Sequence, residues 1–310
     1  PVRPPVAWIK AMTSCKQRHE EEFEETAWDN YIEKNLKNEK PEVITFFKNT
    51  PKATASVHSK EASVRALSYT LNRLLMNPGL DVLNGPTNTS WFDHWQKYLE
   101  SKGVEFRFES ELTSFEISEN KITKAEILHQ GKTISINASH FLSCLPHKIL
   151  ENVFTNEQIQ NYSLTNLREL KSGWQAGIVL YLSKPILLPK GHFGFSCSTW
   201  AISGIQQSDF WTETNLKDYV HTRKYGASLS LIIADWDAPG DLTGKPAREC
   251  TLSEIIQELK FQLEKYAPEE YKNGFASMNV VDYTIDPAIH LTGDNNSGND
   301  SPLFMNTINS

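Results

Sequence analysis

Two aspartates, Asp235 and Asp237, flank a tryptophan directly after the apolar run LSLIIA. Two carboxylates beside a cavity can hold a proton or bind a cationic group of a substrate. Aspartates at a strand end before Pro-Gly more often cap or brace a loop, and the nearby Lys245 or Arg248 can neutralise them. We therefore expect this pair to brace a loop.

Cysteine and histidine are the other residues that could do chemistry. The four cysteines lie far apart with no CxxC pair, and none of the nine histidines pairs with another at metal-ligand spacing. This spacing argues against a metal site and a disulfide framework, and predicts reduced thiols in a cytoplasmic protein. One cysteine, Cys250, begins a capped helix, where a thiol pKa can fall, but packing is the simpler role.

Familiar catalytic patterns are missing from the chain. The sequence contains no HExxH, P-loop, GxSxG, EF-hand or GxGxxG pattern. Metalloprotease, NTPase, serine-hydrolase and calcium-binding functions therefore have no supporting residues. The sequence names no catalytic residue.

Composition excludes two further classes of partner. The 310 residues are 39% hydrophobic and 22% charged, with a formal net charge of −7. No apolar run is long enough to span a bilayer, so no transmembrane segment is expected. No cluster of Lys and Arg interleaved with aromatics occurs, so a nucleic-acid partner is not expected. The acidic run at residues 19–25 is expected to be a solvated face.

The first half of the chain predicts helices and then a meander. After an irregular entry expected at 1–25, the first 80 residues are mostly helical, with leucines at spacings of three and four in 64–75. A second amphipathic helix follows the turn Asn84-Gly85-Pro86 and ends at Gly103. Alternation then predicts a strand at 104–108, followed by three short antiparallel strands. The compact apolar segment FLSCLP, residues 141–146, predicts a buried central strand.

The second half predicts a sheet with a covering helix. Residues 147–172 are polar and helical, and strand patterns follow at 174–182, 192–205 and 228–236. Residues 251–266 form an amphipathic helix in which Thr251 and Glu254 have capping-box spacing. A last strand is predicted at 278–285.

Several stretches together resemble one enzyme superfamily. They are GPTNTSWFDHWQKYLESKGVEFRFESELTSFEI, FLSCLP, GWQAGIVLYL, ADWDAPGDLTGKPARECTLSEI and DPAIHL. They resemble the FAD-dependent oxidoreductases of the amine-oxidase and phytoene-desaturase superfamily, and most of all its hydroxysqualene-dehydroxylase-like, carotenoid-desaturase-like branch. The resemblance runs from about Asp29 to Ser310, and DWDAPG…GKPAREC is its most distinctive part.

The resemblance implies an α/β fold with α+β character. Residues 84–150 would form the second half of a glutathione-reductase-type FAD/NAD(P)-binding domain. A substrate lobe would combine the helical residues 1–83 with the mixed sheet and helices of 151–285, and residues 286–310 would return toward a second FAD motif. Relatives also carry a GxGxxG phosphate cradle and that second motif, and this sequence has neither. We therefore expect an internal fragment, natural or proteolysed, that binds FAD weakly or not at all.

The resemblance also implies which residues contact the cofactor. The backbone of Leu112 would lie against the FAD adenine, and Cys144, Leu145 and Pro146 would form the strand end that passes the cofactor. From the residues alone, Leu112 can equally be a hairpin core residue and Cys144 a small buried hydrophobic residue.

Aromatic side chains of the second lobe are candidates for a substrate cavity. Flavin chemistry needs a dry, shaped, apolar pocket, and a sheet of the substrate lobe would wall it. A tryptophan on a strand is more often ordinary core. The candidates are Trp174, Tyr181, Trp200, Trp211 and Trp236.

The function implied for the intact parent is FAD-dependent oxidation, desaturation or dehydroxylation of a lipophilic, isoprenoid- or carotenoid-like substrate, with hydride passing to the flavin. The fragment alone would be inactive. Two alternatives stay open: a flavin amine oxidase, and a non-catalytic module without cofactor that binds a lipid or a protein. Peripheral membrane contact and the oligomeric state are also open.

Overall fold

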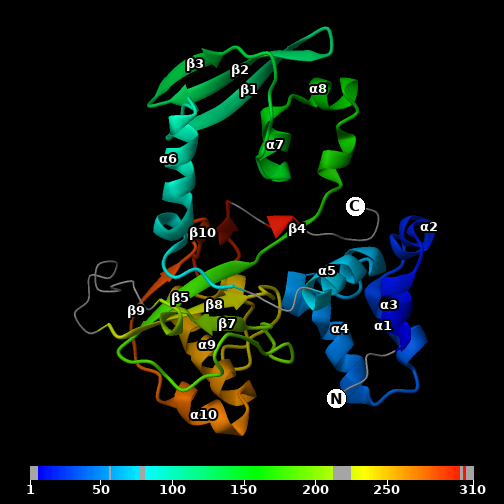
Figure 1. The fold of residues 1–310 in the computed structure, drawn as a ribbon, viewed down its shortest axis with the longest axis vertical. Helices are drawn as coiled ribbons and strands as arrows, with labels where there is room; N and C mark the ends of the chain where they lie inside the picture. The colour runs from blue at the N-terminus through cyan, green and yellow to red at the C-terminus, as the bar shows by residue number, and fades with distance from the viewer. Residues whose placement is uncertain (1–5, 56, 77–80, 212–224, 301–302, 305–310) are drawn as a thin grey trace. The chain divides into compact units, whose positions relative to one another are not determined.

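A computed structural model of the chain describes residues 6–55, 57–76, 81–211, 225–300 and 303–304. The chain divides into two compact units (Figure 1). Unit 1 combines residues 1–85 and 172–310, and unit 2 is residues 86–171. Residues 151–171, assigned to the substrate lobe from the sequence, cluster with unit 2. No helix of the described chain is both long enough and apolar enough to cross a bilayer.

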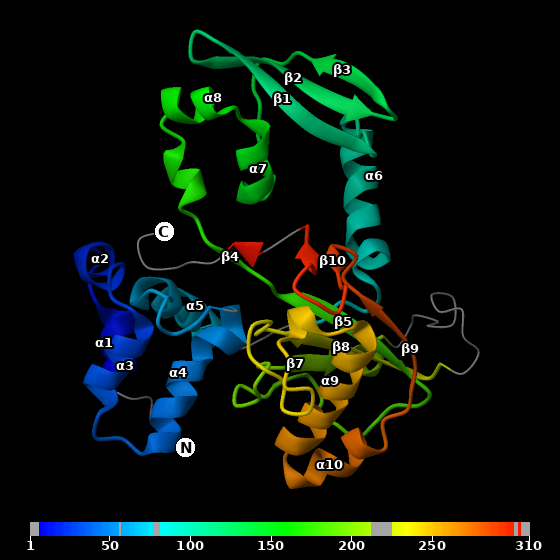
Figure 2. The same ribbon diagram turned by 180° about the vertical axis from the view of Figure 1, so that it is seen from behind.

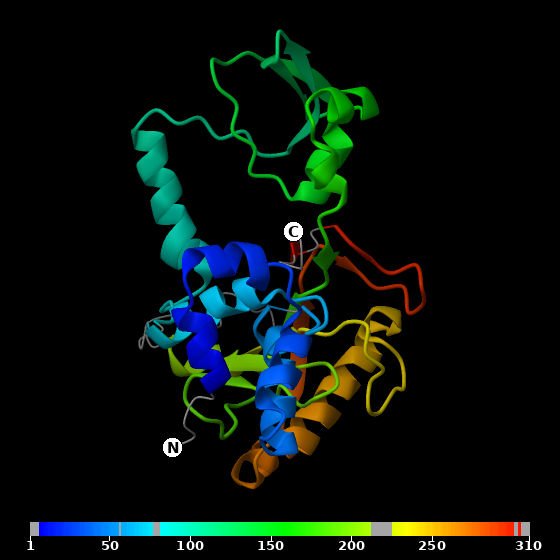
Figure 3. The same ribbon diagram turned by 90° about the vertical axis from the view of Figure 1, so that its right-hand side faces the viewer.

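The first part of unit 1 is a bundle of helices (Figure 3). The helices after residue 27 were predicted from the sequence, whereas residues 6–23, expected to be an irregular entry, are mostly helical as well. Trp28 and Val64 are fully buried at its centre, and the Trp28 indole N–H donates to the carbonyl of Phe47 at 2.7 Å. The leucine face of the last helix completes this core. The helices are α1 Val6–Thr13, α2 Lys16–Arg18, the π-helical turn η1 His19–Phe23, α3 Trp28–Leu36, α4 Pro41–Ala55 and α5 Val64–Met76.

The second part of unit 1 is a five-stranded antiparallel sheet in the order β6-β7-β8-β5-β9. Its strands are β5 Ala176–Leu182, β6 His192–Gly194, β7 Ser203–Gln206, β8 Ala227–Ile233 and β9 Val280–Ile285. Alternate residues of β5 are buried and pack with helix α9 Leu252–Tyr266 in one core. Figure 2 shows α9 lying across the sheet, with α10 Glu269–Ala276 beside it. The predicted Thr251–Glu254 capping box begins α9.

Short elements complete unit 1. The strands β10 Ile289–His290 and β11 Gly298–Asn299 pair with each other, and β12 Leu303–Phe304 pairs with β4 Ser172–Gly173. Two 3-10 turns, η4 Gln207–Asp209 and η6 Ala247–Glu249, lie in the loops of the sheet.

Unit 2 contains the predicted helix and meander. The π-helical turn η2 Asn88–Phe92 leads into α6 Asp93–Ser101, which stops at Gly103, where φ is +87°. The antiparallel sheet consists of β1 Ser110–Ser118, β2 Lys121–His129 and β3 Lys132–Ile136. The polar helices α7 His147–Val153 and α8 Asn156–Asn161 and the 3-10 turn η3 Thr165–Arg168 follow, as expected.

Two predicted strands are wrong. Neither 104–108 nor 141–146 forms a strand. A strand needs a neighbour for its backbone N–H and C=O groups, and the described residues provide none for these segments. Their apolar side chains are consequently exposed: Phe108 by 64% and Leu142 by 91%. Cys144 is exposed as well, so its alternative assignment as a buried residue is also wrong.

Candidate functional site

An apolar cavity of about 440 Å³ in unit 2 brings together three of the four predicted cofactor residues: Leu112, Cys144 and Leu145. The fourth, Pro146, precedes α7, where its carbonyl accepts the N–H groups of Ile149 and Leu150 at 3.0 and 2.9 Å. Sequence reasoning missed the rest of the lining, which is Phe115, Ile122, Ala125, Phe141, Leu142, Ser143, Leu150 and Phe154.

The meander and the helices after it form this cavity. Phe115 on β1 lies opposite Ala125 on β2, and its ring contacts the ring of Phe154 with centroids 5.3 Å apart. The Gln158 amide of α8 donates to the carbonyl of Phe115 at 3.2 Å, which holds α8 to β1. Alternation along β1 could have identified Phe115 as an inward residue, whereas α7 joins the site only through tertiary packing.

The chemistry of the lining fits only part of an FAD molecule. Apolar walls suit a flat ring system, for which dispersion and area burial supply the contact. A pyrophosphate instead needs cationic side chains or a row of free backbone N–H groups at a glycine-rich helix start. The described lining contains no Lys or Arg, and Ser143 supplies its one hydroxyl. These residues can therefore contact an adenine-like ring but cannot hold the phosphates.

The predicted substrate-cavity aromatics have different surroundings. Trp200 and Trp236 are fully buried, and their indole N–H groups donate to the carbonyls of Ala238 and Ile233, both at 3.0 Å. Both belong to the main core of unit 1. The half-buried Trp174 packs on Trp236 with ring centroids 5.4 Å apart, so the indole of Trp174 is in contact with the main core.

Tyr181 and Trp211 are also half-buried. The ring of Tyr181 meets the ring of Tyr225 edge to face at 5.4 Å. A role for these five aromatics in lining a substrate cavity stays a prediction.

The two aspartates around Trp236 brace their loop, as predicted. One carboxylate oxygen of Asp235 accepts the backbone N–H groups of Asp237 and Ala238, both at 3.0 Å. The other oxygen forms an ion pair with Lys52 of α4, and Asp237 forms one with Arg248. The sequence did not identify Lys52, because only the fold brings α4 to this loop.

Of the two cations offered by the sequence, Arg248 is the one that pairs with an aspartate. Lys245 pairs with Glu254 at 2.6 Å and so does not neutralise the aspartates. His58, Asp235 and Asp237 place ligand atoms within 4.8 Å of one another, a grouping that no sequence spacing indicates. Lys52 and Arg248 already neutralise the two carboxylates, so the electrostatics oppose a metal ion there.

A buried glutamate anchors the adjoining loop, residues 240–243. Glu258 on α9 is fully buried, and its carboxylate accepts the backbone N–H groups of Asp241 at 2.7 Å, Leu242 at 2.9 Å and Thr243 at 2.7 Å. A side-chain carbon at Gly240 would lie 2.5 Å from this carboxylate, so only glycine fits. Buried hydrogen bonds to Glu258 thus hold the start of the distinctive GDLTGKPAREC stretch against α9.

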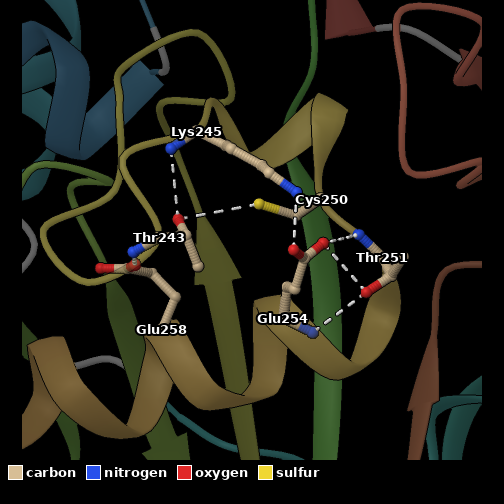
Figure 4. Close-up of polar contacts among 6 residues, drawn as sticks. All are labelled: Thr243, Lys245, Cys250, Thr251, Glu254 and Glu258. Atoms are coloured by element: carbon tan, nitrogen blue, oxygen red, sulfur yellow. Dashed lines mark hydrogen bonds and ion pairs between the residues drawn. The ribbon is translucent and has the colours of Figure 1, made fainter.

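Figure 4 shows the exposed end of the same arrangement. Lys245 and the Thr251 N–H lower the pKa of Glu254 to about 2. Burial raises the pKa of the Cys250 thiol, whose sulfur lies 3.9 Å from the Thr243 hydroxyl. Cys250 is therefore a packing residue, as expected, because a nucleophilic cysteine requires a lowered pKa.

Comparison with known proteins gives a fold and no family. No family model and no curated protein matches the chain. Among solved structures, an oxidoreductase from Methanosarcina mazei is 12% identical with a TM-score of 0.58, over 84% of this chain and 56% of that chain. A triple mutant of putrescine oxidase from a cofactor-binding redesign is 11% identical with a TM-score of 0.60, over 92% and 58%.

Wild-type putrescine oxidase bound to putrescine is 10% identical with a TM-score of 0.56, over 97% of this chain and 62% of that one. The chain therefore spans less than two thirds of the length of each of these enzymes. At such identities the likeness concerns the fold alone: this chain has the fold of a large part of these oxidoreductases.

Proposed function

We propose that this chain is part of an FAD-dependent oxidoreductase of the amine-oxidase-like superfamily. The observation that carries the proposal is the fold similarity to oxidoreductases over 84–97% of the chain. Residues 84–150 contribute the second half of the cofactor domain, 1–83 with 172–285 contribute the substrate lobe, and 151–171, first expected in that lobe, belong with the cofactor domain because they cluster with unit 2. Residues 286–310 are proposed, from the resemblance, to return toward a second FAD motif.

The properties of unit 2 support its assignment to a cofactor domain. The segments 104–108 and 141–146 enter and leave the meander, carry apolar side chains, and lack strand partners among the described residues. Both suit a larger sheet whose remaining strands come from elsewhere in the whole protein. The apolar cavity with Leu112, Cys144 and Leu145 lies beside the second segment.

The flavin and the protein would contribute different parts of the chemistry. A bound flavin supplies the hydride acceptor, and the protein supplies orientation and an environment that excludes water. The unit 2 cavity offers contact for the adenine end, and phosphate binding must come from other residues. This chain alone therefore binds FAD weakly, and catalysis requires the whole protein.

A lipophilic, isoprenoid- or carotenoid-like substrate is the preferred class, and its reaction is oxidation, desaturation or dehydroxylation. The two aspartates nearest the buried tryptophans are already ion-paired, so they offer no free negative charge to a cationic substrate. Among the aromatic candidates, the half-buried rings of Trp174 and Tyr181 offer apolar surface suited to a hydrocarbon chain.

The test is the visible spectrum of the protein expressed from its whole gene. Bound FAD gives the absorption of an oxidised flavin, which bleaches on reduction. The variant Cys144→Trp should lose bound FAD because the indole fills the cavity, whereas Cys15→Trp, at an exposed cysteine of unit 1, should retain it. A colourless protein that takes up no added FAD would reject the proposal in favour of a non-catalytic binding module.

A second candidate, a flavin amine oxidase, is favoured by the similarity to putrescine oxidase. The two reactions are distinguished by anaerobic reduction of the bound flavin. Putrescine as the reductant supports the amine oxidase, and a long-chain isoprenoid as the reductant supports the preferred class.

A further inference from the structure

A second cavity, of about 420 Å³, lies in the helical part of unit 1. Side chains from α1, α2, η1 and α3 form its walls, including Lys10, Arg18, Glu22 and Lys34. Its volume falls within the range of small-molecule sites and exceeds what an inorganic anion needs. The proposed flavin chemistry does not use it.

The charge of this cavity is opposite to that of the chain. Three cations, Lys10, Arg18 and Lys34, face one carboxylate, Glu22, in a protein whose net charge is −7. Neither lysine forms an ion pair with a described residue. Arg18 forms an ion pair with Glu22, with 3.1 Å between the Arg18 Nε and the Glu22 carboxylate. The cavity thus concentrates positive potential, to which an anion is attracted.

Two of the glutamates near the cavity are paired with cations outside its lining. Glu20 pairs with Lys16 at 3.6 Å, and Glu24 pairs with Arg65 at 3.2 Å. Most glutamates of the acidic run at 19–25 are exposed, as expected from the sequence, and of them only Glu22 lines the cavity.

Two aromatic rings give the cavity an apolar wall. Phe23 is 3% exposed and Tyr31 is 8% exposed, and the two rings meet edge to face with centroids 5.6 Å apart. The π-helical turn η1 brings both Glu22 and Phe23 to the cavity. Such turns are rare and often occur at functional sites.

We propose that this cavity binds a small organic anion that carries a carboxylate or phosphate group on an apolar body. The lysine ammonium groups and Arg18 bind the anionic group, and the rings of Phe23 and Tyr31 contact the apolar part. The anion competes with Glu22 for Arg18, so the carboxylate of Glu22 sets the affinity.

The test is isothermal titration of the whole protein with phenyl phosphate, benzoate and inorganic phosphate as probes. Phenyl phosphate should bind more tightly than inorganic phosphate because it uses the aromatic wall, and benzoate shows whether a carboxylate suffices. Lys34→Gln should weaken binding by about fivefold, the effect of one partly exposed charge. Glu22→Gln should tighten binding by a similar factor, because it releases Arg18.

A matched control is Lys37→Gln, an exposed lysine that follows α3 outside the cavity lining, and it should leave the affinity unchanged. Helical circular dichroism confirms that each variant is folded. The proposal is overturned if phenyl phosphate does not bind to the wild-type protein, if Lys34→Gln and Lys37→Gln have equal effects, or if Glu22→Gln weakens binding.

Discussion

The substitution Glu258→Gln tests the claim that a buried carboxylate holds the loop at residues 240–243. Both carboxylate oxygens accept backbone N–H groups, and the Gln262 amide donates to one of them at 2.8 Å. A glutamine replaces one accepting oxygen with an NH₂ group that faces N–H donors. At least one buried donor then lacks a partner, which costs about 1–3 kcal/mol.

The loss of charge adds to this cost, because hydrogen bonds to a charged acceptor contribute about 1.5–3 kcal/mol each. We expect Glu258→Gln to lower the free energy of unfolding by about 3 kcal/mol in total. Glu258→Ala should cost more, because it removes every acceptor and leaves a cavity.

The assay is urea unfolding followed by tryptophan fluorescence, to which the buried Trp200 and Trp236 contribute. Glu264→Gln is the control, because Glu264 is exposed on the same helix and should change stability by less than about 0.5 kcal/mol. If Glu258→Gln and Glu264→Gln shift the unfolding midpoint equally, the carboxylate does not hold the loop.

Three further predictions concern unit 1. Lys52→Met leaves the nearly buried carboxylate of Asp235 without its cation and should destabilise the protein by about 2 kcal/mol in urea unfolding, and an unchanged midpoint would contradict this. Burial, and secondly Arg65, lower the pKa of His19 below 6.5, so the stability that this residue contributes is fully present above pH 6.5 and is lost as the pH falls from 6.5 through the lowered pKa of the folded protein; His19→Phe should flatten the decline between pH 7 and 5, and an equal slope would refute it. The raised pKa of Cys250 predicts much slower alkylation than at the exposed cysteines, which mass mapping after iodoacetamide treatment measures; equal rates would be inconsistent with its burial.

Local patterns predicted most elements correctly because those elements contain their own signals. The capping box at Thr251 and Glu254 and the glycine at position 103 mark helix ends within a few residues of sequence. The continuous apolar run at 176–182 predicts a strand, and in the fold β8 and β9 pair with this strand on its two sides. Such signals depend only on residues that are close together in the sequence.

The parts of the candidate sites that the sequence did not reveal depend on contacts between distant segments. Lys52 meets Asp235, and Glu258 meets the loop at 240–243, only after α4 and α9 have packed. In the sequence, the sign of a buried acceptor was the position of Glu258 on the apolar face of α9. The cationic cavity likewise requires α1, η1 and α3 to pack before its charges come together.

The alternating segment 104–108 and the compact apolar segment 141–146 show how far a local pattern can determine structure. The pattern specifies which side chains share a face, but a strand is stable only when a neighbour accepts and donates its backbone hydrogen bonds. Within the described chain these segments have no such neighbour, so their sequence is suited to a sheet that is not formed. Phe108 and Leu142 are exposed for this reason: in a complete sheet they would pack in a core, and without that sheet they face solvent. Apolar segments that lack strand partners among the described residues agree with the proposal that further strands complete a cofactor sheet, so unit 2 supports the proposed flavoprotein more strongly than the ion-paired aspartates of unit 1 do.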